Sequence, residues 1–452
     1  MKIIVVGCGK IGSTLVQQLN EEDHDIVVID EKEDRVKAIT DELDAMGIVG
    51  NGVSYQTLSD AGVRNADLLI AVTGSDEENL LCCVVAKRTG HCKTIARVRN
   101  PIYTNEISFL RNELGISMII NPDLIAASDI ARVLQFPSAM KVDNFARGRV
   151  ELIHFKVTED CLLKDMELIN IRKKLDCEVL ISIVMRGEEL TIPRGDFVFH
   201  AGDVAAVLST PAAAVDFFKK VGIETGRVRT AMIAGGGNIS YYLARRLIAT
   251  GISVKIVERD EKRCEELNEL LPKALIINAD ATDEKILKQE GLSAVEGFVA
   301  LTGVDEENIL LSLFAGKFSG AKTVTKINRI NYNNVTSEIS LDAVTFPSLL
   351  SADVITKYAR SMNATLESNM ENLYKLEDGR VEAMEFLINE ASKVTDTPLM
   401  NLKLKPSLLI GAIIRNGKAI LPGGQDEILV GDSVVVITTH KKLNDIKEIL
   451  EA

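Results

Sequence analysis

The sequence is poor in features that mark several large classes of protein. It has no tryptophan and only 4% aromatic residues, so no aromatic cluster stands out as an interface anchor. No apolar run approaches the ~18 residues that a membrane-spanning helix needs. The first residues, MKIIVVGCGKIG, predict a strand at once and leave no room for a signal peptide. We therefore expect a cytoplasmic protein that is not inserted in a membrane.

Basic charge and metal-binding patterns are also scarce. A net charge of −13 argues against nucleic acid as the main partner and against attachment to anionic lipid. The seven cysteines include no C-x-x-C pair, so neither a zinc site nor a disulfide framework is indicated. Cys82 and Cys83 are neighbours in an apolar helical segment, and we expect them to be core residues rather than a redox pair.

What the chain does contain is an internal repeat of half its length. Sliding the second half over the first aligns GCGKIG at residues 7–12 with GGGNIS at residues 235–240. AVTGSDEENLL likewise matches ALTGVDEENIL, and IPRGDFVFHAGD matches LPGGQDEILVGD. The same register pairs Asp30 with Glu258, and Arg97 with Lys326. Each half begins with a longer A segment and ends with a shorter B segment, which gives the order A-B-A′-B′.

The A segments alternate short apolar strands with charged helical stretches. In the first copy the pattern predicts strands at residues 3–6, 26–29, 46–49, 68–72, 94–98 and 117–120. Nearly continuous apolar strands are typical of a parallel sheet covered by helices on both faces. We therefore expect two α/β domains with doubly wound, Rossmann-like parallel sheets.

The B segments show short strands with glycine turns, which predicts a small α+β domain in each half. The strands lie within residues 151–210, and a helical stretch follows them at residues 211–222. Helical runs at 121–134 and 346–359 join A to B, and residues 222–230 form the predicted linker between the halves. The expected domains are residues 1–135, 140–222, 229–360 and 365–452.

The first A segment carries a full G-x-G-x-x-G between a strand and a helix. Gly7 allows a tight turn, Gly9 lets the backbone approach a pyrophosphate, and Gly12 lets the helix pack close to the strand. We expect free N–H groups of the Gly7–Ile11 turn to face phosphates at the positive end of the helix dipole. Asp30 ends the second strand, where a carboxylate accepts hydrogen bonds from an adenosine ribose.

The ends of the fourth and fifth strands add further candidates. Thr73 and Gly74 end a strand at the carboxyl edge of the sheet, and either cofactor contact or a purely structural role fits them. Ser75 and Glu78 follow in a capping-box pattern that predicts a helix start rather than a ligand site. Arg97, on the fifth strand, either contacts phosphates or pairs with a surface acid, and we favour the phosphates.

The second copy departs from the first at a few positions. Ser240 stands where the third glycine belongs, and it affects only the contact between helix and strand. Glu258 is longer than Asp30, and Arg259 beside it suits an extra phosphate or stacking on adenine. We therefore expect the second site to bind nucleotide with an altered affinity or preference.

Catalytic machinery is not evident in the sequence. None of the five histidines recurs in the other copy, and the B segments show no paired carboxylates and no nucleophile–base pair. A dehydrogenase normally adds a substrate domain with a general acid–base group. We therefore expect a nucleotide sensor without catalytic residues or a metal site, and the alternative is an NAD-dependent oxidoreductase with an unrecognised acid–base group.

The motifs quoted above, in their A-B-A′-B′ order, resemble the TrkA family. Its members are peripheral nucleotide-binding subunits of Trk-type potassium uptake systems, and the resemblance spans the chain. It implies that the A segments are RCK-N (KTN) domains and the B segments RCK-C domains. It also implies a homo-oligomeric ring, a dimer or tetramer, on the cytoplasmic face of a membrane potassium transporter.

The resemblance further implies which ligands bind and where. NAD(H) is the implied ligand, and the adenine nucleotides ATP and ADP also bind in the family. The implied cofactor contacts in the first copy are Gly7, Cys8, Gly9, Lys10, Ile11, Asp30, Thr73, Gly74 and Arg97. In the second copy they are Gly235, Gly236, Gly237, Asn238, Ile239 and Glu258. Ser240, and Lys326 in place of Arg97, depart from the family pattern and bear on the preference of the second site.

Overall fold

The computed structural model describes residues 1–135, 139–223, 228–329, 339, 341–363, 370–377, 379–441, 443 and 445–451. The chain forms two compact units, one of Met1–Leu134 with Val228–Ala359 and one of Gln135–Arg227 with Arg360–Ala452. The first unit therefore holds both A segments, and the second holds both B segments. Of the predicted linker at 222–230, residues 224–227 lie outside the described residues.

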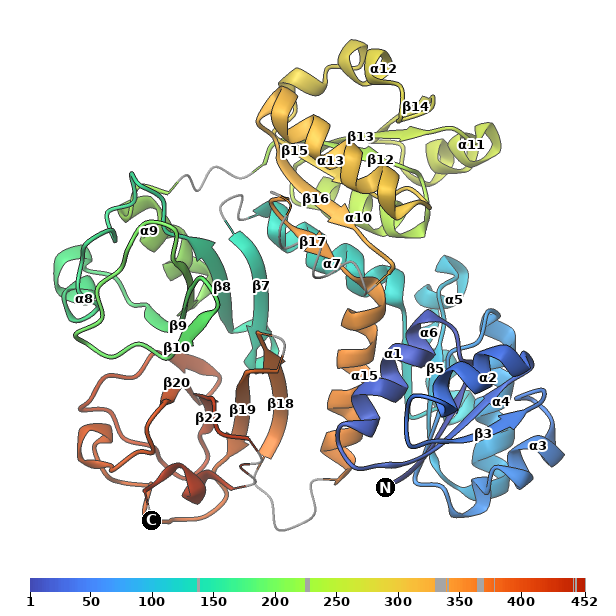
Figure 1. The fold of residues 1–452 in the computed structure, drawn as a ribbon, viewed down its shortest axis with the longest axis horizontal. Helices are drawn as coiled ribbons and strands as arrows, with labels where there is room; N and C mark the ends of the chain where they lie inside the picture. The colour runs from blue at the N-terminus through green and yellow to red at the C-terminus, as the bar shows by residue number, and fades with distance from the viewer. Residues whose placement is uncertain are drawn as a thin grey trace. The chain divides into compact units, whose positions relative to one another are not determined.

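The first A segment contains a six-stranded parallel sheet in the order β3-β2-β1-β4-β5-β6 (Figure 1). Its strands are β1 (Lys2–Val6), β2 (Asp25–Asp30), β3 (Met46–Val49), β4 (Leu68–Ala71), β5 (Lys93–Arg97) and β6 (Met118–Ile120). The chain moves outward from β1 in both directions, which confirms the predicted doubly wound topology. The central β1 and β4 are buried on both faces, as their apolar sequences predict.

Helices cover both faces of this sheet. They are α1 (Lys10–Asn20), α2 (Glu33–Thr40), α3 (Tyr55–Asp60), α4 (Asp76–Gly90), α5 (Pro101–Asn105) and α6 (Ile107–Leu114), with the 3-10 helix η1 (Val63–Asn65). Cys82 and Cys83 lie on α4, and both are buried in the hydrophobic core that it forms with the sheet. The prediction that they are core residues is confirmed.

The second A segment repeats this arrangement in the order β14-β13-β12-β15-β16-β17. Its strands are β12 (Thr230–Ala234), β13 (Ser253–Glu258), β14 (Leu275–Asn278), β15 (Gly297–Ala300), β16 (Lys322–Lys326) and β17 (Val344–Thr345). Its helices are α10 (Asn238–Ala249), α11 (Glu261–Leu270), α12 (Glu284–Gln289) and α13 (Asp305–Ser319), with η3 (Leu292–Ala294). The same sheet order in both copies confirms the duplication read from the sequence.

The two helices that leave the A segments are exchanged between the copies. α7 (Pro122–Gln135) belongs to the first copy, but its apolar side packs into the core of the second, against α10 (Figure 1). α15 (Pro347–Asn363) belongs to the second copy, and its Asp353 and Thr356 hydrogen-bond to Gln18 on α1 of the first. Both helices were predicted from sequence, whereas their exchange was not. This exchange joins the two parallel sheets in one unit.

The second unit consists of two antiparallel five-stranded sheets. The first copy has the order β10-β9-β11-β8-β7, and the second has β18-β19-β22-β20-β21. The strands of the first are β7 (Ala139–Phe145), β8 (Val150–Lys156), β9 (Leu180–Arg186), β10 (Glu189–Thr191) and β11 (Val204–Ser209). Those of the second are β18 (Met370–Leu376), β19 (Val381–Leu387), β20 (Leu408–Arg415), β21 (Lys418–Ile420) and β22 (Ser433–Thr438). The predicted strands are present, and β7 is an additional strand that the pattern did not predict.

Each sheet of the second unit buries one face in a hydrophobic core formed by its own copy. The other face is buried in a hydrophobic core that both copies form together. Leu152, Ile183 and Leu208 of the first copy meet Ala383 and Val435 of the second in one buried cluster. The first copy adds α8 (Ile169–Leu175), α9 (Pro211–Lys220) and η2 (Ala146–Gly148), and the second has η5 (Leu399–Asn401) and η6 (Ile446–Ile449). Apolar burial on both faces of β8, β11 and β22 follows from this arrangement.

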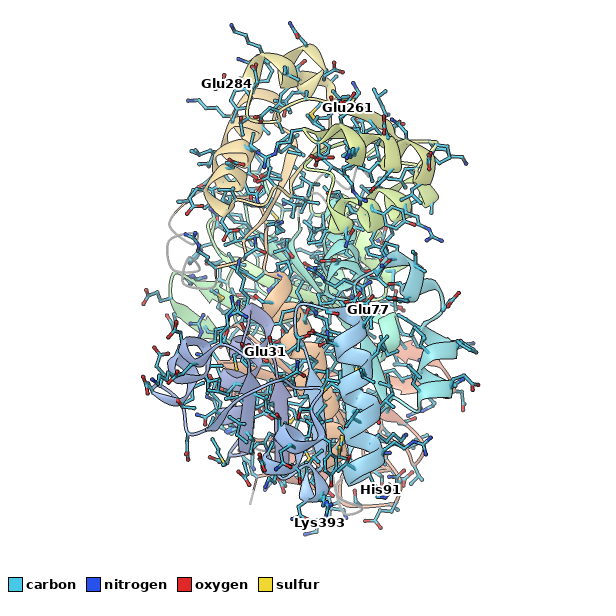
Figure 2. The ribbon with its side chains drawn as sticks, turned by 90° about the vertical axis from the view of Figure 1, so that its right-hand side faces the viewer. Glu31, Glu77, His91, Glu261, Glu284 and Lys393 are labelled. Atoms are coloured by element: carbon cyan, nitrogen blue, oxygen red, sulfur yellow. The ribbon has the colours of Figure 1, made fainter. Side chains whose placement is uncertain are left out.

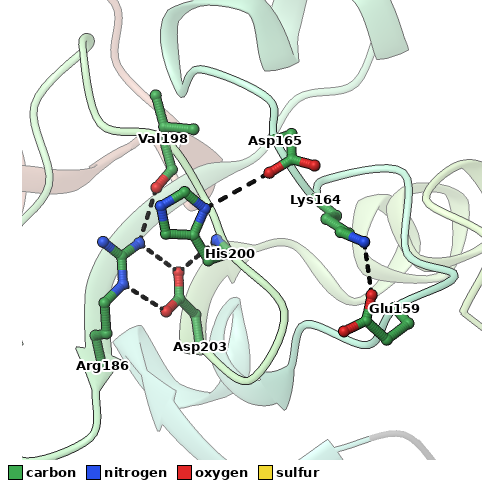
Figure 3. A network of polar contacts seen from close by, with 7 residues as sticks. All are labelled: Glu159, Lys164, Asp165, Arg186, Val198, His200 and Asp203. Atoms are coloured by element: carbon green, nitrogen blue, oxygen red, sulfur yellow. Dashed lines mark hydrogen bonds and ion pairs between the residues drawn. The ribbon is translucent and has the colours of Figure 1, made fainter.

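The closing GD turn of each B segment is held by a buried carboxylate. Asp203 accepts two hydrogen bonds from the guanidinium of Arg186 and one from the backbone N–H of His200, each of 2.8 Å (Figure 3). Burial alone would raise the pKa of Asp203, but these hydrogen bonds outweigh it, so the pKa lies below its ordinary value. Asp432 and Arg415 repeat the pair in the second copy, at 2.8 and 2.9 Å. Repetition at matching positions identifies this pair as part of the fold of the module.

Many acidic side chains are exposed to solvent, among them Glu31, Glu77, Glu261 and Glu284 (Figure 2). Across the described residues, none of the helices is both long enough and apolar enough to cross a membrane.

Candidate nucleotide site

A cavity of about 510 Å³ lies at the carboxyl edge of the first parallel sheet. The predicted site residues that line it are Gly7, Gly9, Lys10, Ile11, Asp30, Thr73, Gly74 and Arg97. Cys8 is not among the lining residues. Its thiol has a pKa raised to about 12, first by burial and then by the charge of Asp30. Eight of the nine candidates of the first copy are therefore brought together around one cavity, at the place where ligands bind in open α/β sheets.

The three glycines of the first turn differ in what surrounds them. Gly7 has a φ of +102°, and a Cβ on it would lie 2.8 Å from the backbone nitrogen of Thr73. A Cβ on Gly12 would lie 1.9 Å from the carbonyl oxygen of Gly7. Gly9 has a φ of −77° and nothing within 4 Å of a Cβ, so a side chain there would project into open space. Gly7 and Gly12 are therefore required by the backbone, whereas Gly9 leaves room beside the turn.

The hydrogen bonds of the turn correct one prediction from the sequence. The N–H of Gly7 donates to the carbonyl of Ile29, and the N–H of Cys8 donates to Asp30 Oδ2 at 2.7 Å. Neither group is free for a phosphate, because the turn is tied to the end of β2. Lys10 and Ile11 lie in the first turn of α1, where backbone N–H groups have no partner inside the helix. Donors for an anion therefore come from the start of α1.

Asp30 has a structural task besides the predicted ribose contact. Its Oδ2 accepts from Cys8 N–H and its Oδ1 accepts from Lys32 N–H at 2.9 Å. Arg35 lies 3.6 Å from the same carboxylate. Asp30 therefore joins the glycine turn to the end of β2 and also lines the cavity.

Arg97 is the main electrostatic feature of the cavity. It is 8% exposed, and its Nε and one terminal nitrogen, Nη2, have no hydrogen-bond partner among the described residues. Burial and the nearby charge of Arg99 lower the pKa of Arg97. The surface ion pair considered as an alternative is not present among the described residues, although the charges of Asp76 and Asp123 act on Arg97. A buried guanidinium with unmet donors, lining a cavity, suits an anionic ligand.

Two further residues organise the site, and sequence reasoning did not single them out. Asn79 is buried, accepts from Thr73 N–H at 2.8 Å and donates to the carbonyl of Arg97 at 3.0 Å. Asp76 Oδ2 accepts from the backbone N–H groups of Arg99 and Asn100. Together they fix the ends of β4 and β5 beside the cavity. The identical DEEN in both halves was a usable signal, since Asp305 and Asn308 repeat these contacts.

Ser75 caps α4 as predicted, because its hydroxyl accepts from the N–H of Glu78. The carboxylate of Glu78 instead contacts the hydroxyl of Thr73 at 3.2 Å. Thr73 is thus tied to the helix start, and Gly74 beside it is exposed and has open space around it.

The second glycine turn has the same frame with compensating changes. Gly236 N–H donates to Glu258 Oε2 at 2.6 Å, as Cys8 N–H does to Asp30. A Cβ on Gly236 would lie 2.9 Å from Cγ of Glu258. Cδ1 of Leu267 would lie nearer still, at 2.8 Å, so Glu258 and Leu267 together leave no room for a side chain at Gly236. The packing of Glu258 and Leu267 therefore accounts for the middle glycine of GGG.

Ser240 is accommodated by a hydrogen bond. It is fully buried, and its hydroxyl donates to the carbonyl of Gly235 at 2.5 Å. The equivalent carbonyl in the first copy is that of Gly7, which a Cβ on Gly12 would overlap. Arg263 adds a second contact, from Nε to the carbonyl of Gly236 at 2.8 Å. Two carbonyls of the second turn therefore have side-chain partners.

We predict unequal effects of substitutions at these matched positions. Gly12→Ala is expected to lower the free energy of unfolding by about 1–3 kcal/mol through overpacking. Ser240→Ala should cost about 1 kcal/mol, because it removes a hydrogen bond and leaves Gly235 without that donor. Urea denaturation would measure both, with Gly74→Ala as a control at a glycine whose surroundings are open. Equal stability of Gly12→Ala and Gly74→Ala would contradict the argument.

The second copy also reaches the first cavity. Ile239 lines it, whereas Gly235, Gly236, Gly237, Asn238 and Glu258 do not. Lys326 and Asn328 line it as well, and so do Pro347 and Ser348 at the start of α15. The predicted residues of the second copy therefore lie at their own glycine turn, and Arg259 beside them is exposed. Of these residues, Ile239 also lines the first cavity.

Other titratable groups also line the cavity, among them Cys82, Lys32 and Arg35. None of the seven cysteines, all within the described ranges, forms a disulfide, and all seven are buried. His154 is buried on β8 in the second unit, 3.1 Å from Glu377 and 3.5 Å from Asp143. Within the described part of the chain, no group of three or more His, Cys, Asp or Glu residues is arranged to hold a metal ion.

The duplicated parallel sheets, each with a glycine turn at the first strand–helix junction, define a tandem Rossmann-type chain with paired antiparallel modules. Comparison with known families is specific: the TrkA-N domain matches residues 3–122 and 231–347, and the TrkA-C domain matches residues 152–222 and 383–451. The chain belongs to the TrkA family.

Relatives in this family match over nearly the whole chain. The Trk system potassium uptake protein TrkA homolog 1 of Methanosarcina mazei is 30% identical, over 99% of both chains. The TrkA protein of Haemophilus influenzae is also 30% identical, over 98% of this chain and 96% of its own. These are names of transport proteins, in agreement with the prediction that the chain is not an enzyme.

Solved structures share the fold at low sequence identity. The GsuK RCK domain is 18% identical with a TM-score of 0.63, and covers 97% of this chain and 92% of its own. A GsuK channel bound to NAD is 17% identical with a TM-score of 0.64, and covers 97% of this chain and 77% of its own. The predicted tandem arrangement of RCK-type domains agrees with these neighbours.

Proposed function

We propose that this chain is a nucleotide-binding regulatory subunit of a membrane potassium transporter of the Trk type. The observation that carries the proposal is the cavity at the first glycine turn, where the buried Arg97 presents donors without a partner. Family membership supports the transport role, since the relatives are named as Trk system potassium uptake proteins. A neighbour with the same fold is a channel bound to NAD, which supports NAD(H) as the ligand.

The proposed site uses the residues of the two glycine turns. The adenosine ribose would contact Asp30, the pyrophosphate would lie beside Gly9 and the start of α1, and Arg97 would meet the phosphates. Thr73 and Gly74 would contact the ligand from the end of β4. In the second copy Gly237, Asn238 and Glu258 would take the matching roles. ATP and ADP are proposed as further ligands because their phosphates and ribose present the same groups.

The proposed assembly is a homo-oligomeric ring, a dimer or tetramer, on the cytoplasmic face of the membrane. The four proposed domains are residues 1–135, 140–222, 229–360 and 365–452. A ligand can shift a conformational equilibrium only through its different affinities for the two states. A coupling of about 1–3 kcal/mol would change transporter gating by about 5–150-fold.

Calorimetric titration of Gly9→Asp and Gly237→Asp variants tests the proposal. Both positions have ordinary φ values and open space around a Cβ, so the variants are expected to fold. An aspartate would place a negative charge where the phosphates are proposed to lie. Each variant is expected to lose binding at its own site, with the other site preserved. Retention of both sites in both variants, for NAD, NADH, ATP and ADP alike, would refute the proposed sites.

A further inference from the structure

The cationic end of the first cavity is built from both copies of the repeat. Lys10, Arg97 and Arg99 of the first copy line it together with Lys326 of the second. The exchanged helix α7 packs into the core of the second copy, so one unit holds both contributors. A ligand with phosphates beside Arg97 would therefore meet a lysine from the other half of the chain.

Lys326 occupies the same place in its sheet as Arg97. It is the last residue of β16, as Arg97 is the last of β5. The pKa of Lys326 lies below its ordinary value, mainly because the side chain is buried, and the charge of Lys10 lowers it further. The carboxylates of Asp305 and Asp123 raise the pKa but do not offset the burial. The ammonium is thus close enough to Lys10 and Asp123 to interact with both charges. Its Nζ contacts the carbonyl of Leu301 at 3.4 Å, a long bond that leaves donors for another partner.

Asp123 is the acid whose charge interacts with Arg97, Arg99 and Lys326 alike, whereas Asp76 acts on Arg97 and Asp305 on Lys326. Asp123 is the second residue of α7, lines the cavity and is half-buried. Burial raises the pKa of its carboxyl, while Arg99, a hydrogen bond from Asn238, Arg97 and Lys326 oppose the rise. Asn238 is the first residue of α10, directly after the second glycine turn. Asp123 therefore compensates part of the positive charge that faces the cavity.

We propose that Lys326 is a phosphate-binding residue of the first nucleotide site and that Asp123 is its built-in counter-charge. Phosphates entering the cavity compete with Asp123 for the same cations, and they repel its carboxylate. The penalty from Asp123 and the gain from Lys326 both grow with the number of phosphate charges. This pair of residues therefore sets how strongly the site discriminates among AMP, ADP and ATP. The proposal rests on the nucleotide-binding function proposed above.

The test is a titration of AMP, ADP and ATP into full-length protein that carries Gly237→Asp, so that the first site alone reports. Asp123→Asn keeps a side chain that can bond to Asn238 and removes one charge. It is expected to raise the affinity for all three nucleotides. The increase should be largest for ATP, on the order of tenfold, smaller for ADP and smallest for AMP. Lys326→Gln is expected to lower affinity in the same order, and Lys326→Arg to restore it.

Two matched variants in the second copy control for net charge. Asp283→Asn is at the exposed N-cap of α12, where asparagine also caps, and Lys285→Gln is exposed on the same helix. The inference would be overturned if Asp123→Asn and Lys326→Gln had the same ratios of affinity for ATP, ADP and AMP as the two controls. That result would leave nucleotide binding itself intact. A Lys326→Arg variant that melts normally yet binds as weakly as Lys326→Gln would also overturn it. Absence of binding by the Gly237→Asp parent would count against the proposed function itself.

Discussion

Replacing Arg97 with leucine is expected to weaken nucleotide binding at the first site by about 100-fold, because at least two charge-assisted hydrogen bonds would be lost. The same change is expected to stabilise the ligand-free chain by about 1–3 kcal/mol, because it removes a buried charge with unmet donors. Opposite signs for binding and stability are typical of a residue kept for function. Calorimetry of nucleotide binding and urea denaturation without nucleotide would measure the two effects.

Arg99→Leu is the informative comparison for Arg97→Leu. Arg99 lines the same cavity but is exposed, so its loss should weaken binding without a gain in stability. A loss of stability in Arg97→Leu, as large as that expected for a broken core contact, would mean that Arg97 is structural. The phosphate role assigned to it would then be wrong.

Asp203→Ala is expected to have the largest effect on stability, lowering the free energy of unfolding of the second unit by about 3 kcal/mol. The carboxylate is buried and holds both the guanidinium of Arg186 and the N–H of His200 (Figure 3). Its removal leaves these donors unpaired within the GD turn. Arg186 also donates to the carbonyl of Val198 and lies over the ring of Phe197, and because its side chain is 43% exposed, water can replace part of the lost contact.

Asp432→Ala should have a similar effect, because Arg415 makes the matching contacts in the second copy. Asp216→Ala on α9 serves as the control, since Asp216 is exposed and pairs only across one helical turn with Lys220. Thermal and urea unfolding would compare the three variants. If Asp203→Ala were no more destabilising than Asp216→Ala, the pair would have no structural role.

The fold was predictable because its signals are local and occur twice. Apolar strands such as Leu68–Ala71, followed by charged helices, are a pattern of parallel sheets, and the repeat supplied an independent second reading of each element. The strand β7 was missed because Ala139–Phe145 carries polar residues and no strict alternation. Its place in the sheet comes from pairing with β8 rather than from its own propensity.

The site was predictable only in part. Glycine positions, Asp30 and Arg97 follow from motif and register, and the structure gathers them at one sheet edge. Asn79 and Asp76 were not recognised because their partners are backbone groups of β5 and the loop after it, which lie close only in the folded chain. The N–H groups of Gly7 and Cys8, expected to be free, turned out to bind the end of β2.

The sequence by itself determined the repeat, the doubly wound sheets and the position of both glycine turns, because these depend on local conformation and on the period of apolar residues. It also placed Ser240 as the point where the copies differ. Only the tertiary structure decided what that difference means, since Ser240 donates to the carbonyl of Gly235, and Gly236, the middle glycine of GGG, makes way for Glu258. The exchange of α7 and α15, and with it the meeting of Lys326 and Asp123 in the first cavity, depends on long-range packing that no local pattern encodes.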